Sequence, residues 1–292
     1  PIELPNGAVL TLEPLKRNGN RLGLDGFNPC TILLNNDLSA GVPPILQGLH
    51  EQFVLPPLHA GWATRRKSNH FAAYDDVASE FAAMVGIDPW HINPYFSVCR
   101  SINFHERQGE ECLAANVDAV LGMIREKYRE YGIDETPFVI VKADAGTYGM
   151  GVMTVRDASE VTGLNRKQRN KMSVIKEGQE VSEVIIQEGV PTYELVNEAV
   201  AEPVVYMIDR YVVGGFYRVR PEQGGGATAN GSPDASYVPL AFAESHHLPK
   251  PGERPGASAP NRFYMYGVIG RLAMLAAAYE LEATDPDAEV YD

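Results

Sequence analysis

The sequence predicts a mixed fold of helices and strands, of the α+β or α/β class. Three observations support this prediction: short apolar runs rich in β-branched and aromatic residues, long stretches with apolar residues at helical spacing, and one glycine-rich segment directly after an apolar run. The short runs are typical of buried strands, and the long stretches are typical of helices that bury one face. Because the two kinds of segment alternate along the chain, we expect mixed sheets packed against helices.

The composition is that of an ordinary globular protein. With 292 residues, of which 45% are hydrophobic, the chain can bury a substantial core in one large domain or two modest ones. The formal net charge of −13 argues against general binding to nucleic acid or to an anionic membrane. No apolar run approaches the ~18 residues of a membrane span. Cys30, Cys99 and Cys112 are widely spaced and form no CxxC pair, which is typical of a reducing compartment, so we expect a cytoplasmic protein.

Residues 1–60 are rich in proline, glycine and asparagine, and we expect them to form turns around short apolar pieces. Arg17 and Arg21 lie in this part. They either support the turns or hold a substrate carboxylate, to which arginine is well suited. The first residues, PIELPNGAVL, contain neither an initiator methionine nor a secretion signal, so we expect an internal start with further sequence upstream.

A first helix is expected over residues 70–85, where apolar side chains recur at helical spacing. Ser68 is a suitable N-cap for it. Arg65, Arg66 and Lys67 come just before this helix, although the positive end of a helix dipole disfavours cations there. A bound anion would resolve this conflict, and a solvated basic turn is the alternative.

Two further helices show the same periodicity. Apolar residues between positions 110 and 131 form one stripe, and Gly132 is a natural C-terminal stop. Cys112 lies close to this stripe and is interpreted as a small core residue. The last helix spans roughly residues 262–282. Its expected buried face consists of Val268, Leu272, Leu275 and Tyr279.

The segment 138–151, FVIVKADAGTYGMG, is the most informative part of the chain. Phe138–Val141 predicts a strand covered on both faces, and Lys142 follows it directly. Glycines in the loop permit positive φ and a close approach to a ligand, and successive backbone N–H groups there can cradle phosphate. The loop consists of Gly146, Thr147, Tyr148, Gly149, Met150 and Gly151.

This loop differs from two better-known phosphate loops. In a P-loop the lysine follows the glycines, whereas Lys142 precedes them. The order G-x-x-G-x-G also differs from the dinucleotide fingerprint G-x-G-x-x-G. A strand and turn with incidental glycines is the alternative interpretation, because short glycine motifs have a high false-positive rate.

The later part of the chain contains further strands. One is expected over residues 183–187. The runs 203–208 and 211–219 lie on either side of Asp209-Arg210 and give the best hairpin signal in the chain. Gly214-Gly215 would permit a bulge in the second strand of this hairpin.

Strand, lysine and glycine-rich loop together resemble the nucleotide-binding hairpin of ATP-grasp enzymes, and the order of the other parts agrees. The resemblance implies mixed sheets with a glycine-rich lid hairpin over a nucleotide cleft. It also implies that two lysines contact the phosphates of ATP and that a hinge after a strand binds adenine through backbone groups. The residues implied are Lys67 and Lys142 for the phosphates, Gly146 to Gly151 for the lid, Gln187, Glu188, Gly189 and Val190 for the hinge, and Glu194 for the ribose.

Longer strings are similar to the proteobacterial type of glutamate–cysteine ligase. They are GFN (26–28), LLNNDLSAGVP (33–43), GW…RRKSNHF (61–71), VKADAGTYGMGVMTV (141–155), IIQEGV (185–190) and AEPVVYMID…VGGFYRV (201–219). The resemblance implies that ATP drives the joining of L-glutamate to L-cysteine, the first step of glutathione synthesis. The γ-carboxylate of glutamate would form an acyl phosphate, which the cysteine amine then attacks. Lys67, Lys142, Arg218 and Mg²⁺ would neutralise the developing phosphoryl charge.

The sequence departs from this family's pattern beyond residue 220. Asn230 is all that represents its asparagine-rich stretch, and it is the residue that the resemblance implies for the metal. The carboxylate–x–Asn metal pair that is usual in ATP-grasp enzymes is not found. Other ATP-grasp carboxylate–amine ligases, such as a glutathione synthetase, and a non-catalytic nucleotide-binding module stay open as alternatives, as does a homo-oligomer. We expect residues 1–62 to form an acceptor-side segment before the grasp, and residues 63–292 to form the ATP-grasp-like region.

Overall fold

The structure is a computed structural model that describes residues 1–36, 38–49, 51–61, 64–146, 151–173, 180–219, 236–239 and 262–286. The chain forms two compact units, residues 1–65 and residues 66–292, and each is described by itself. None of the helices in these described ranges combines the length and the apolarity that crossing a membrane requires.

The first unit is built from three pairs of short strands. Two pairs are antiparallel, β1 (Ile2–Glu3) with β2 (Val9–Leu10) and β3 (Lys16–Asn18) with β4 (Arg21–Gly23), and one is parallel, β5 (Thr31–Leu33) with β6 (Phe53–Leu55). Two short 3-10 helices complete the unit, η1 (Pro44–Leu46) and η2 (Leu58–Ala60).

Two arginines of this unit bind backbone carbonyls. Arg17 Nη1 donates to the carbonyl of Gln47 at 2.5 Å, and Arg17 Nη2 donates to that of Gly48 at 3.2 Å. Arg21 Nη1 donates to the carbonyl of Glu51 at 2.6 Å. Because these guanidinium groups are bound to backbone groups of their own unit, the structural role expected for them is favoured over the binding of a substrate carboxylate.

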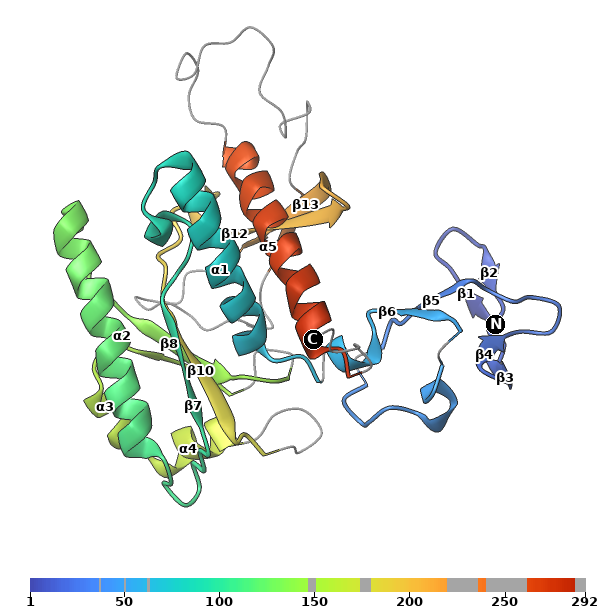
Figure 1. Ribbon diagram of the computed structural model, residues 1–292, viewed down its shortest axis with the longest axis horizontal. Coiled ribbons are helices and arrows are strands. Elements are labelled where there is room, and N and C mark those ends of the chain that lie inside the picture. Colours follow the sequence, from blue (N-terminus) through green and yellow to red (C-terminus); the bar gives the residue numbers. More distant parts are fainter. Residues whose placement is uncertain are drawn as a thin grey trace, which may run out of the picture. The chain divides into compact units, whose positions relative to one another are not determined.

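The second unit contains an antiparallel sheet of four strands in the order β7-β10-β8-β9. The strands are β7 (Phe96–Arg100), β10 (Glu183–Glu188), β8 (Val139–Ala143) and β9 (Val152–Val155). Helix α2 (Glu110–Tyr131) packs against this sheet (Figure 1). The main core lies between them and includes Leu113, Val117, Leu121, Ile124, Val139, Val141, Val184 and Ile186. The short helices α3 (Ser159–Thr162) and α4 (Arg166–Ser173) follow β9.

A second sheet and a helix pair complete this unit. The sheet has the order β11-β12-β13-β14, with β11 (Leu195–Val196), β12 (Ala199–Ile208), β13 (Tyr211–Val219) and β14 (Ser236–Pro239). Helices α1 (Lys67–Val85) and α5 (Arg262–Thr284) lie side by side (Figure 1). Their shared core consists of Tyr74, Val77, Ala78, Leu272 and Ala276. The 3-10 helix η3 (Pro89–His91) precedes β7.

Most expected elements are confirmed. The helix over 110–131 has the expected bounds, and Gly132 adopts φ of +64° at its C-cap, a left-handed conformation in which glycine carries no steric penalty. The expected strand at 183–187 is β10. The hairpin is also confirmed, although β12 begins at Ala199. The strand expected over 138–141 is β8, which continues through Lys142, so this lysine lies inside the strand rather than after it.

Two expectations about the core are wrong. Cys112 is exposed instead of packed in the core. On α5, Leu275 and Tyr279 are exposed. The buried row runs through Leu272 and Ala276, which are four residues apart and therefore lie one above the other on one helix face. The small Ala276 side chain lets α1 approach that face.

Candidate functional site

The N-terminus of α1 is capped by a residue from the end of β8. Asp144, of which 1% is exposed, accepts hydrogen bonds from the backbone N–H of Ser68 at 2.8 Å and from Ser68 Oγ at 2.6 Å. The backbone N–H of Lys67 donates to the Asp144 carbonyl at 2.9 Å. The helix starts at Lys67, so Ser68 lies within it and is not the N-cap that we expected. The capping carboxylate comes instead from a residue 76 positions away.

This arrangement explains the cations before α1. We considered a bound anion as the compensating charge, but the protein supplies that charge itself. Arg66 Nη1 lies 4.0 Å from Asp144 Oδ2, and the same guanidinium pairs with Glu183. An anionic carboxylate at the positive end of the helix dipole stabilises the helix and compensates the neighbouring cations.

The Lys67 side chain binds the start of the glycine-rich loop. Its Nζ donates to the carbonyls of Ala143 at 2.8 Å, Asp144 at 3.2 Å and Gly146 at 3.2 Å. Burial lowers the pKa of Lys67, and the charge of Asp144 partly opposes this effect. Lys67 thus ties α1 to the first residues of the loop.

Lys142 lies next to this junction and is largely buried. Burial and, to a smaller extent, the positive charge of Lys67 lower its pKa to about 8, and the charge of Glu202 partly opposes them. No residue in the described ranges forms a hydrogen bond with the Lys142 side chain. A buried ammonium without a partner is costly, and such groups are concentrated at functional sites. Lys142 is therefore a candidate for binding an anionic ligand.

Glu202 and Arg218 form the other side of this charged cluster. They face each other across β12 and β13, where Arg218 Nε donates to Glu202 Oε2 at 2.9 Å and Arg218 Nη2 donates to the same oxygen. Glu202 is a functional candidate that the sequence analysis missed. The signal that could have found it is the register of the hairpin, which determines which residue lies opposite Arg218.

The expected hinge consists of the last two residues of β10 and the two residues that follow, and hydrogen bonds hold it in place. Glu188 is 5% exposed, and its carboxylate accepts hydrogen bonds from Trp90 Nε1 at 3.1 Å and from the backbone N–H of Tyr95 at 2.9 Å. The next residue, Gly189, donates its N–H to the carbonyl of Phe138 at 2.8 Å. A Cβ on Gly189 would come within 2.0 Å of the Phe138 ring, so glycine is required by close packing there.

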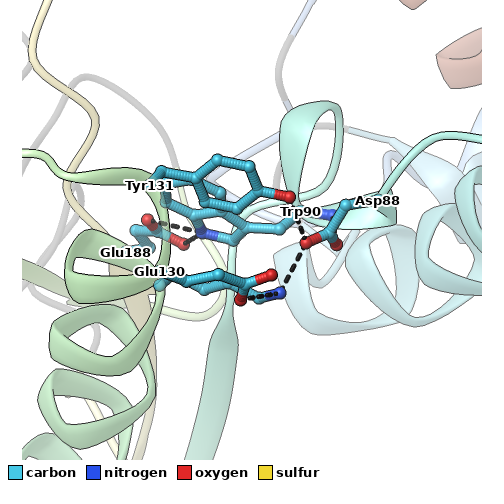
Figure 2. Close-up of polar contacts among 6 residues, drawn as sticks. Asp88, Trp90, Glu130, Tyr131 and Glu188 are labelled. Atoms are coloured by element: carbon cyan, nitrogen blue, oxygen red, sulfur yellow. Dashed lines mark hydrogen bonds and ion pairs between the residues drawn. The ribbon is translucent and has the colours of Figure 1, made fainter.

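Trp90 is held by groups on α2 and η3. Figure 2 shows its indole lying over the ring of Tyr131, at a centroid distance of 5.3 Å and an interplanar angle of 19°. Asp88 accepts hydrogen bonds from Lys127 at 2.5 Å, from the Tyr131 hydroxyl at 2.7 Å and from the backbone N–H of Trp90 at 2.9 Å. The hydrogen bond from Lys127 contributes most to lowering the pKa of Asp88 to about 2. This network braces the segment that carries Glu188.

We expect Trp90→Phe to destabilise the second unit by about 2 kcal/mol at neutral pH, because it removes a donor from a buried, charged carboxylate. Burial raises the pKa of Glu188. As pH falls, the folded state therefore takes up this proton at a higher pH than the unfolded state does. As pH rises, the ionised carboxylate makes folding less favourable. The deficit of the variant should therefore shrink as pH falls through this raised pKa. Urea unfolding followed by circular dichroism at several pH values measures it.

Tyr131→Phe is the control for this experiment, because it keeps the stacked ring and removes only the hydroxyl bound to Asp88. Its loss of stability should be smaller, and it should not change as Glu188 takes up a proton. If Trp90→Phe and Tyr131→Phe showed the same loss at every pH, the indole N–H would not support the Glu188 charge.

The remaining predicted site residues are spread over several elements, and some lie outside the described ranges. Glu194 Oε1 accepts a hydrogen bond from the Tyr266 hydroxyl of α5 at 2.5 Å. Gly146 and Gly151 have φ of +91° and +61°, so both ends of the glycine-rich loop use conformations that favour glycine. Gln187 lies in β10, and Val190 is exposed. Thr147, Tyr148, Gly149, Met150 and Asn230 lie outside the described residues.

The described residues fit phosphate better than they fit a metal ion. Lys142 offers positive charge, and the backbone at Gly146 adopts positive φ. Both features suit the binding of phosphate oxygens. No group of three or more histidine, cysteine, aspartate or glutamate side chains in the described ranges could hold a metal ion. Glu202 is the carboxylate next to Lys142, and Arg218 already binds it, so these residues do not form a magnesium site by themselves.

Comparison with known proteins gives a consistent assignment. A protein-family model described as GshA, glutamate-cysteine ligase, matches residues 1–281. A crystal structure from Methylobacillus flagellatus KT, provisionally named a gamma-glutamylcysteine synthetase, is 59% identical with a TM-score of 0.83. The match covers 96% of this chain and 66% of that one, so the chain spans slightly less than two thirds of that protein's length. The crystal structure of D-cycloserine synthetase DcsG matches with a TM-score of 0.36 and 14% identity, over 82% of this chain and 58% of that one. No curated protein matches.

Proposed function

The chain belongs to the glutamate–cysteine ligase family, and from this premise we propose that it joins the γ-carboxylate of L-glutamate to the amine of L-cysteine with hydrolysis of ATP to ADP. The observation that carries the proposal is Lys142, a largely buried ammonium next to Lys67 that has no hydrogen-bond partner among the described residues. The phosphates of ATP would supply an anionic hydrogen-bond acceptor for this ammonium. We propose an ATP-grasp-like arrangement in which the two lysines and the glycine-rich loop surround these phosphates.

The two lysines would have different tasks. Lys142 is free to bind a phosphate oxygen directly, as a point charge in a low-dielectric site. Lys67 binds three carbonyls at the start of the loop, so its main task would be to hold the loop backbone while its charge adds to the local potential. Asp144 would position Lys67 by capping α1. Mg²⁺, when bound with the nucleotide, would neutralise phosphate charge, as it does in other phosphoryl transfers.

Arg218, held by Glu202, would bind on the opposite side of the transferred phosphoryl group. The Glu202 carboxylate fixes the plane of the guanidinium through two donors. A fixed guanidinium needs little reorganisation when charge develops on the phosphoryl oxygens, which is how preorganised donors lower a barrier. Catalysis would then rest on positioning and charge neutralisation, with no protein nucleophile. The hinge at 187–190, braced by Trp90 and Tyr95, would bind adenine through backbone groups.

The decisive experiment measures ADP release with Mg-ATP and L-glutamate, with and without L-cysteine. Release that requires both amino acids, with γ-glutamylcysteine as the product, would support the proposal. Release with a different acceptor would keep the nucleotide chemistry and reject the acceptor. ATP binding without ADP release for any amino acid pair would reject ligase activity for this chain.

We expect the affinity for ATP to fall as pH rises above about 8, because Lys142 then loses the proton that gives it charge. Below this pH the free protein carries the ammonium, and the affinity should depend little on pH. Titration calorimetry with a non-hydrolysable ATP analogue, from about pH 6.5 to about pH 9.5, measures the change. Lys142→Arg keeps its charge throughout this range, so it should lose the alkaline decline. An affinity that stays constant to the alkaline limit in the wild type would contradict the assignment.

A further inference from the structure

Two cysteines that are distant in the sequence meet in the second unit. Cys99 lies in β7, and Cys112 lies in the first turn of α2. Their sulfur atoms are 3.8 Å apart, which is van der Waals contact for two thiols. The turn between β7 and α2 reverses the chain and brings the two side chains together. The pair depends on this turn and is therefore not visible as a CxxC-type motif in the sequence.

The two thiols have different access to solvent. Cys112 is exposed, whereas Cys99 is 1% exposed and lies in the main core. Burial and the adjacent Cys112 together raise the pKa of Cys99 to about 12, and a hydrogen bond with Asn116 partly opposes them. A reagent in solution therefore reaches Cys112 first, and Cys99 can react only with a group already attached to Cys112.

An amide group is directed at the sulfur of the exposed cysteine. Asn116 Nδ2 lies 3.5 Å from Cys112 Sγ and donates to the Cys112 carbonyl at 2.9 Å. Ser97 Oγ donates to Asn116 Oδ1 at 2.7 Å, which orients the amide so that its N–H groups point toward Cys112. An N–H donor next to sulfur stabilises the negative charge that develops there during thiol–disulfide exchange.

We propose that Cys112 and Cys99 form a thiol modification site that exchanges with small disulfides, in which Cys112 is the attacking residue and Cys99 the resolving one. The Sγ–Sγ contact and the difference in exposure carry this proposal, and it does not depend on the ligase activity. The ligand class is a low-molecular-weight disulfide, such as oxidised glutathione.

The exchange has two balanced steps. Cys112 gives up its proton to solvent and its sulfur attacks one sulfur of oxidised glutathione, so that one glutathione leaves as a thiolate and takes up a proton. Cys99 then gives up its proton to solvent and attacks the Cys112 sulfur, which breaks the mixed disulfide and releases the second glutathione as a thiolate that takes up a proton. In total two protein thiols are oxidised to one disulfide, and one glutathione disulfide is reduced to two thiols.

The test uses the full chain carrying Cys30→Ser, which removes the third, exposed thiol. The protein is incubated with mixtures of oxidised and reduced glutathione, its remaining thiols are alkylated after denaturation, and the intact mass is measured. We expect one transition to a species with no alkylated thiol and no bound glutathione. Adding Cys99→Ser should arrest the reaction as a mixed disulfide at Cys112, and Cys112→Ser should slow the overall reaction by more than about tenfold, because Cys99 is buried.

Three results would overturn the proposal. The first is two alkylated thiols at every glutathione ratio. The second is a stable glutathione adduct in the protein that retains both cysteines, since this would show that Cys99 does not resolve it. The third is Cys112→Ser protein reacting as fast as the parent. Cys99→Ala replaces Cys99→Ser if the buried hydroxyl prevents folding, and the measurement on the parent protein requires no core substitution.

Discussion

Lys142→Ala should lower kcat/KM for ATP-dependent ligation by about 30-fold to 1,000-fold, equivalent to roughly 2–4 kcal/mol of transition-state stabilisation, as for removal of one preorganised donor from an oxyanion site. The physical reason is its environment. The ammonium is largely buried next to a second lysine, and it has no hydrogen-bond partner among the described residues, so a phosphate oxygen would be bound with little competing solvation. Steady-state kinetics with ATP as the varied substrate measures the effect.

Stability separates this loss of activity from misfolding. Since an unpaired buried charge makes the folded state less favourable, Lys142→Ala should be at least as stable as the wild type at neutral pH. Lys171, which lies exposed on α4, is the matched control, and Lys171→Ala should retain normal activity. If kcat/KM of the Lys142 variant stayed within about threefold of the wild type, Lys142 would not bind the phosphates.

Asp144→Ala should destabilise the second unit by about 3 kcal/mol, because it removes a buried carboxylate that caps α1 and compensates the cations around it. Urea unfolding followed by circular dichroism measures this loss. The substitution also removes the group that holds Ser68 and Lys67 against the end of β8. We therefore expect weaker ATP binding in addition to lower stability, even at temperatures where the variant is fully folded.

Asp144→Asn tests whether α1 needs the charge of Asp144 or only its hydrogen-bond acceptor, and Asp157→Ala is a control at an exposed helix start. Asp144→Asn keeps an acceptor for the Ser68 N–H but loses the negative charge, so it should retain part of the stability and less of the ATP affinity. Asp157 forms the same kind of contacts with Ser159, at 2.9 Å and 2.5 Å, at the exposed start of α3. Asp157→Ala should have a smaller effect on stability and none on ATP binding. An Asp144→Ala protein within about 0.5 kcal/mol of the wild type would contradict the capping role.

The secondary structure was largely predictable, because its causes are local. Periodicity predicted the helix over 110–131 and its glycine stop, as well as the strand that ends at the hinge. Lys142 was recognisable because a buried strand and a glycine-rich loop lie on either side of it in the sequence. The start of α1 was misplaced for the same reason. Ser68 is the best local candidate for a cap, but Asp144 is a stronger one and comes from another part of the chain.

The partners of the site residues could not be predicted, because they depend on register and packing. Asp209-Arg210 forms a two-residue turn, and a regular hairpin around it would place Ala201 opposite Arg218. A bulge next to Gly214 shifts the register by one residue, so that Glu202 faces Arg218 instead. A one-residue shift exchanges the two faces of a strand, and sequence patterns do not show which of several possible positions carries the bulge.

The sequence by itself thus determined the three long helices, the strands β8 and β10, the β12–β13 hairpin and the family. The tertiary structure alone decided which charges meet: Asp144 with the helix that carries Lys67, Glu202 with Arg218, and Glu188 with Trp90. It also decided that Cys99 and Cys112 touch. The physical reason is the range of the forces involved. Backbone propensities and apolar periodicity act over a few residues, whereas these contacts join residues between 13 and 98 positions apart and form only when sheets and helices pack.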